Sequence, residues 1–123
     1  MSEISNQKPV YDLEERTYLF AKNFRLILKK IPRTVYNEDD IKQLIRSSGS
    51  VGANYIEANE SLSKKDFIHR TRIARKEAKE SAYWIRLLSE SDEHINQKEF
   101  ANAYKEANEL KRILSAILTK SAV

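Results

Sequence analysis

The residues best suited to chemistry in this sequence are the cations between Ser63 and Arg86. That stretch contains eight lysines and arginines against three acidic residues. If the stretch is helical, a turn of about 100° per residue places seven of the eight within an arc of roughly 120°. Lysine and arginine neutralise phosphates, and Tyr83, on the same arc, offers a ring on which a base can stack. The sequence therefore predicts a nucleic-acid-binding surface, here called the basic arc, composed of Lys64, Lys65, Arg72, Arg75, Lys76, Lys79, Tyr83 and Arg86.

A second basic group lies earlier in the chain, at Lys22, Arg25 and Lys29, and is a further candidate for nucleic-acid binding. Its place near the end of a predicted helix has another explanation, because the helix dipole favours cations there. The basic arc also has an alternative interpretation, since outward helix faces are polar in many proteins that bind nothing. The near absence of acidic residues on the arc favours binding, because an idle surface normally mixes both signs.

The residue types give little support to catalytic or metal chemistry. The chain has no cysteine, which excludes disulfides, thiolate zinc sites and cysteine nucleophiles. His69 and His94 are far apart, and Glu77 and Glu80 are not part of the two Glu-x-x-His pairs that a carboxylate-bridged metal site needs. We therefore expect no catalytic residue, no metal and no cofactor, and a protein that is not an enzyme.

The elements that carry these residues are predicted to be helices. The chain has 123 residues, 33% of them charged, with two glycines, two prolines and a net charge of +4. This length and composition are typical of a single helical domain. Apolar periodicity predicts helices at about 12–32, 37–61, 63–91 and 96–120, with a frayed N-terminus at 1–11. Helices of this length with short connections form an up-down-up-down four-helix bundle. No signal peptide or membrane span is recognisable, so we expect a cytoplasmic protein with no membrane partner.

Two helices carry informative packing patterns. Small residues from Ser47 to Ala53 would let a neighbouring helix approach closely, and the buried face of the same helix is expected to extend to Leu62. The next helix has a heptad seam running from Phe67 to Leu88. A second apolar group on that helix, Ile73, Trp84 and Leu87, predicts a subunit interface, with the edge of a broad core as the alternative.

The strings Gln43-Leu-Ile-Arg-Ser-Ser-Gly-Ser-Val-Gly-Ala-Asn-Tyr-Ile-Glu-Ala58 and Lys76-Glu-Ala-Lys-Glu-Ser-Ala-Tyr-Trp-Ile-Arg-Leu-Leu88 carry a resemblance. With the intervening Ser63-Lys-Lys-Asp-Phe67 and Arg72-Ile-Ala74, they resemble the bacterial four-helix-bundle proteins of the 23S rRNA intervening-sequence type. Related in fold are the accessory variability proteins of diversity-generating retroelements, which work with a reverse transcriptase and its RNA. The resemblance implies a homopentameric ring. It also implies that Arg46, Asn54 and Glu57 join helices or subunits.

These observations lead to one functional expectation and one alternative. The expectation is a basic helical bundle that forms homo-oligomers and binds nucleic acid, RNA or DNA, with structured RNA favoured. The alternative is a structural adaptor whose outer face binds a protein, such as a reverse transcriptase or another nucleic-acid enzyme. Binding of RNA by the purified protein alone separates the two.

Overall fold

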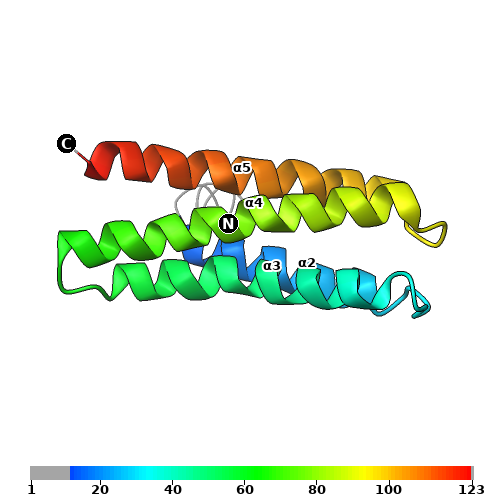
Figure 1. The fold of residues 1–123 in the computed structure, drawn as a ribbon. Helices are drawn as coiled ribbons and strands as arrows, with labels where there is room; N and C mark the ends of the chain where they lie inside the picture. Colours follow the sequence, from blue (N-terminus) through cyan, green and yellow to red (C-terminus); the bar gives the residue numbers. More distant parts are fainter. Residues whose placement is uncertain (1–11, 123) are drawn as a thin grey trace, which may run out of the picture.

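The computed structural model describes residues 12–122, and these residues form four helices and no strand. The helices are α2 (Leu13–Leu28), α3 (Glu38–Asn59), α4 (Lys64–Ser91) and α5 (Gln97–Ser121). They lie side by side, and the chain reverses direction at each connection (Figure 1). The prediction of an all-α four-helix fold is confirmed. The expected frayed segment at 1–11 lies outside the described residues.

Capping side chains explain where three of the helices begin. The side chains of Asp12, Ser63 and Asn96 each accept a hydrogen bond from the backbone N–H three residues later, at 3.0 Å. This satisfies one of the free N–H groups of the first turn. The cap at Ser63 matches the capping spacing in the sequence. The first helix ends at Leu28 rather than near Pro32, because the chain forms a turn at Lys29 and Lys30 before the proline.

Asn37 also precedes a helix, but its side chain has a different role. Its amide oxygen accepts from the backbone N–H of Thr34 at 2.9 Å, and its amide nitrogen donates to the Asp92 carboxylate at 2.6 Å. Asp92 ends α4, so this bond joins the two connections at one end of the bundle (Figure 1). Partial burial raises the pKa of Asp92, but hydrogen bonds from Asn37 and His94 outweigh that effect and the pKa lies below its ordinary value.

The bundle core follows the predicted periodicity. The α4 seam is buried from Thr71 through Ala74, Ala78 and Ile85 to Leu88. These residues pack with the rings and aliphatic side chains of the other three helices, including Phe24 and Phe100. The expectation that Leu62 belongs to the buried face is wrong. Helix α3 ends at Asn59, so Leu62 lies in the connection to α4, where its side chain is fully exposed.

The small residues of α3 allow close approach on two sides, as expected. Toward α2, a Cβ atom added at Gly52 would lie 2.9 Å from Thr17 Oγ1. Toward α4, the buried Ser81 hydroxyl donates to the Ser47 hydroxyl at 2.9 Å. Helix α3 is thus held between two neighbours, and its contacts with α4 fix the orientation of the helix that carries the basic arc. None of the described helices is long and apolar enough to cross a membrane.

Candidate nucleic-acid interface

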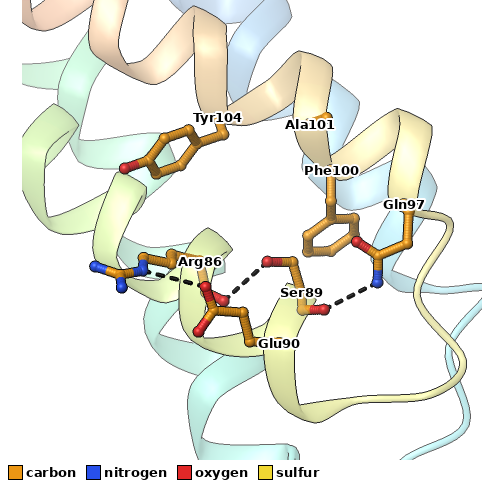
Figure 2. A pocket seen from close by; sticks show the side chains of 7 residues that line it. All are labelled: Arg86, Ser89, Glu90, Gln97, Phe100, Ala101 and Tyr104. Atoms are coloured by element: carbon orange, nitrogen blue, oxygen red, sulfur yellow. Dashed lines mark hydrogen bonds and ion pairs between the residues drawn. The ribbon is translucent and has the colours of Figure 1, made fainter.

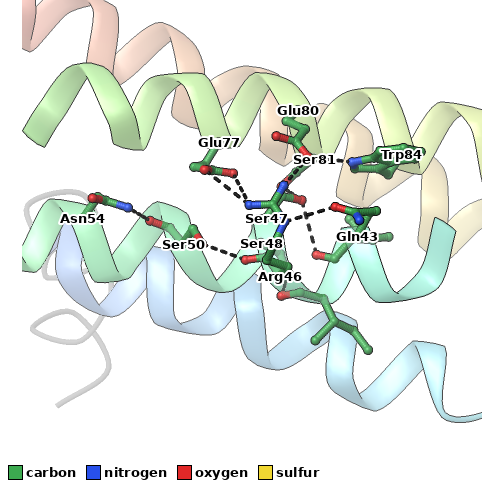
Figure 3. A network of polar contacts seen from close by, with 12 residues as sticks. Gln43, Arg46, Ser47, Ser48, Ser50, Asn54, Glu77, Glu80, Ser81 and Trp84 are labelled. Atoms are coloured by element: carbon green, nitrogen blue, oxygen red, sulfur yellow. Dashed lines mark hydrogen bonds and ion pairs between the residues drawn. The ribbon is translucent and has the colours of Figure 1, made fainter. Parts of the chain in front are cut away.

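Helix α4 has a side that faces α3, where its charged groups are paired. The Arg46 guanidinium of α3 lies 3.2 Å from the Glu77 carboxylate and also pairs with Glu80 (Figure 3). The Trp84 indole N–H donates to Glu80 at 2.9 Å. One arginine therefore connects two carboxylates and, through Glu80, the tryptophan. Of the two predicted roles for Arg46, joining helices or joining subunits, the described residues show the first.

The pKa values of this network reflect its geometry. Partial burial raises the pKa of Glu80, but hydrogen bonds from Trp84 and Arg46 outweigh it, so the pKa lies below its ordinary value. The hydrogen bond to Glu80 in turn raises the pKa of Arg46. Each charge stabilises the ionised form of its partner. Arg46 supplies one positive charge against two carboxylates, and Lys76 also helps to lower the pKa of Glu80, so this side of α4 has no excess of positive charge for a phosphate.

The opposite side of α4, facing α5, carries a groove of about 440 Å³ with a different composition. Arg75, Lys76 and Lys79 line it from α4, and Lys111 and Ser115 line it from α5. We call it the cationic groove. Arg75 Nη1 donates to Ser115 Oγ at 3.4 Å, while within residues 12–122 none of the four cations forms an ion pair. Four cations that converge on a hollow without a carboxylate create a positive potential suited to phosphate.

Lys111 was missed by the sequence reasoning, which considered α4 alone. A signal for it exists, however. In an antiparallel pair joined by a short turn, residues equally distant from that turn face each other. The centre of the α4–α5 connection is residue 94, and equal distances from it place Lys79 and Arg75 within two residues of the levels of Lys111 and Ser115. The pairing of the two helices therefore indicates which turns of α5 form the second wall, although it does not select Lys111 itself.

The remaining residues of the basic arc follow the outward face of α4. Lys64, Lys65 and Arg72 are exposed. Tyr83 is 59% exposed, and its ring packs edge to face with the Trp84 ring, with 4.8 Å between the ring centroids. Arg86 is exposed and lies 3.3 Å from Glu90. The residues of the predicted arc therefore lie along one helix, with the cationic groove on its α5 side and Glu90 beside Arg86 at one end.

The second predicted basic group lies elsewhere. It is on α2, which shares the core with α4 but is not its neighbour within the part of the chain that the structure describes, because the two backbones do not come close. Arg25 donates to Ser48 Oγ at 3.0 Å and to the Ile45 carbonyl at 2.9 Å, so it connects α2 to α3. Lys22 lies 6.0 Å from the centre of the Tyr18 ring, and Lys29 is exposed. These residues do not share a surface with the basic arc.

Three of the residues predicted for a subunit interface belong to the same polar network, since hydrogen bonds connect Asn54 through Ser50 to Arg46, and Arg46 through Glu80 to Trp84 (Figure 3). Ile73, Trp84 and Leu87 are half-buried, and Trp84 packs against the core as the alternative interpretation expected. Asn54 donates to the Ser50 carbonyl of its own helix at 2.8 Å, and Glu57 is exposed.

Comparison with known proteins adds the family. A search of curated proteins gives no match. Among solved structures, the chain is similar to a protein of unknown function from the S23 ribosomal protein family of Bacteroides thetaiotaomicron, with 31% identity and a TM-score of 0.74. That similarity covers 85% of this chain and 96% of the other. The family model for the 23S rRNA-intervening sequence protein matches residues 11–116, so the chain belongs to this family.

Proposed function

We propose that this protein is a non-catalytic RNA-binding protein that recognises structured RNA through the basic arc of α4. The observation that carries the proposal is the cationic groove, where Arg75, Lys76, Lys79 and Lys111 converge without a carboxylate. Phosphate contacts supply most of the affinity of sequence-independent nucleic-acid binding, and they require exposed, uncompensated cations. The α3-facing side of the same helix lacks this property, because Arg46 is paired there with two carboxylates, Glu77 and Glu80.

Self-association into a homopentamer is part of the proposal. Its support is the half-buried apolar group on α4, together with the large exposed side chains Tyr18, Leu19 and Leu26 on α2. An assembly would cover apolar surface and repeat the basic arc, so several weak phosphate contacts would act together. Light scattering of the purified protein tests this assembly, and a monomer at high concentration would contradict it.

The RNA-binding test is a salt titration of affinity for a fluorescently labelled RNA hairpin, using protein freed of carried-over nucleic acid. The wild type is expected to show a steep loss of affinity with salt. The double variant Lys76→Ala/Lys79→Ala is expected to bind more weakly and to show a salt slope smaller by about two. Lys98→Ala/Lys105→Ala removes the same charge from exposed positions of α5 outside the groove and serves as the matched control.

Absence of binding at physiological salt, or equal losses in both double variants, would overturn the RNA-binding proposal. The adaptor alternative would then become the better explanation of the basic arc.

A further inference from the structure

The seam between α4 and α5 has a second hollow, of about 250 Å³, toward the α4–α5 connection. Arg86 and Glu90 line it from α4, and Gln97, Phe100 and Tyr104 line it from α5 (Figure 2). We call it the tyrosine hollow. It shares the seam with the cationic groove, because Arg75, Lys79 and Arg86 are spaced at intervals that place them on one side of α4. Ten residues separate Lys76 from Arg86, so the two hollows lie about 15 Å apart.

The two hollows differ in charge. The cationic groove has four cations and no carboxylate. In the tyrosine hollow the one cation, Arg86, is balanced by Glu90 at 3.3 Å. A phosphate in the tyrosine hollow would meet the Glu90 carboxylate, which repels it. A neutral group is therefore the better occupant.

The side chains of the tyrosine hollow are suited to a flat, polar ring. Tyr104 is 39% exposed, so part of its ring is accessible, while Phe100 is buried in the core beneath the hollow. The Gln97 amide is already engaged, since it donates to the Ser89 carbonyl at 2.9 Å. Glu90 has free acceptor positions and can accept hydrogen bonds from the amino group of a base. Aromatic stacking combined with a carboxylate acceptor is one way to recognise a nucleobase.

We infer that the α4–α5 seam binds an unpaired segment of RNA. Its phosphates occupy the cationic groove, and one base that carries an exocyclic amino group stacks on Tyr104 and donates to Glu90. This inference rests on the proposed RNA-binding function and adds an element of base preference to it. Bases of a duplex are stacked and paired, so only an unpaired segment can place a base in the hollow.

The test compares short single-stranded oligonucleotides of cytidine and of uridine, because uracil lacks an exocyclic amino group. The wild type is expected to bind oligocytidine several-fold more tightly than oligouridine. Tyr104→Leu is expected to weaken oligocytidine binding by roughly tenfold, and Tyr104→Phe, which keeps the ring, is expected to retain it. Tyr36→Leu removes an exposed tyrosine of the α2–α3 connection, outside the seam, and serves as the control.

Glu90→Ala gives the sharpest measurement. If Glu90 acted only through its charge, its loss would strengthen binding of both oligonucleotides equally. The inference instead predicts that the preference for oligocytidine disappears, with oligouridine binding unchanged or tighter. Equal tightening of both, or no effect of Tyr104→Leu, would overturn the inference while the hairpin binding that depends on Lys76 and Lys79 stood. Failure of the wild type to bind any RNA would overturn both proposals.

Discussion

The two sides of α4 use the same residue types for different purposes. Toward α3, Glu77 and Glu80 meet Arg46, and opposite charges are paired across the two helices. Toward α5, cations from both helices, Lys79 and Lys111 among them, line a common groove. A charge paired across a packed interface contributes to the fold, whereas like charges brought together lower its stability. The arrangement toward α5 therefore requires a reason other than stability, and an anionic ligand provides one.

The largest effect is expected from reversing charge in the cationic groove. Lys79→Glu/Lys111→Glu places two carboxylates where phosphates would lie, so we expect the affinity for an RNA hairpin to fall by roughly a hundredfold at low salt. The free energy of unfolding should rise or stay unchanged, because the substitution relieves repulsion. Fluorescence anisotropy measures the first quantity and urea denaturation the second.

The control for this reversal is Lys98→Glu/Lys105→Glu, which makes the same change in net charge on the exposed face of α5. If that variant lost as much affinity, net charge rather than the groove would govern binding. The proposed difference between the two sides of α4 would then lose its functional meaning.

The α3-facing side is expected to respond in the opposite way. Arg46→Ala leaves Glu77 and Glu80 without their cation, and the free energy of unfolding should fall by about 1 to 2 kcal/mol, a value moderated by the partial exposure of Arg46. Affinity for RNA should be unchanged, although a cation has been removed. Lys42→Ala is the matched control, since Lys42 pairs only within its own helix, with Glu38 at 3.7 Å.

A loss of RNA affinity in the Arg46 variant, without loss of stability, would show that the paired side also binds ligand. Thermal unfolding followed by circular dichroism measures the stability, and the hairpin titration measures the RNA affinity.

A smaller effect is expected at the buried contact between Ser47 and Ser81. Each hydroxyl is the other's partner at 2.9 Å, so Ser47→Ala and Ser81→Ala should each lower the free energy of unfolding by about 1 kcal/mol. In the double variant neither hydroxyl remains without its partner. Its loss in the free energy of unfolding should therefore be smaller than the sum of the two single losses. Additive losses from urea denaturation would indicate that the hydroxyls stabilise the bundle through other contacts.

The sequence predicts the fold well, because helical periodicity is a local property. The spacing from Phe67 to Leu88 is enough to identify the α4 seam without knowing its neighbours. The expectation that Leu62 is buried is wrong for a related reason. Periodicity continues past Asn59 in the sequence, but the helix does not.

The candidate site was predicted only in part, because contacts between helices depend on their register. The basic arc lies on a single helix, so the periodicity of α4 alone is enough to place its residues on one face. Placing Lys111 and Tyr104 beside α4 requires the register of the antiparallel α4–α5 pair. Identifying Glu77 and Glu80 as the partners of Arg46 requires the relative placement of α3 and α4. Neither follows from the pattern of one element.

The smallest expected effect is the dependence of stability on pH. It concerns Glu80, on the α3-facing side of α4, and not the cations of the α5-facing side. Folding lowers the pKa of Glu80 below its ordinary value of 4.5. A carboxylate of this kind stabilises the folded chain above its unfolded pKa, and the contribution is lost as the pH falls through the folded pKa. The free energy of unfolding should therefore decline as the pH falls below about 4.5, with Glu80 accounting for less than about 1 kcal/mol of the decline.

Urea denaturation across this pH range compares the wild type with Glu80→Gln. Because glutamine cannot be protonated there, the variant should lose less stability on acidification, while Glu57→Gln, which removes an exposed carboxylate of α3, should follow the wild type. The cationic groove is separate from this network, so RNA affinity should persist until the bundle unfolds. Identical acid sensitivity in the wild type and Glu80→Gln would mean that the Arg46 network does not stabilise the fold. The contrast between a paired and an unpaired side of α4 would then rest on RNA binding alone.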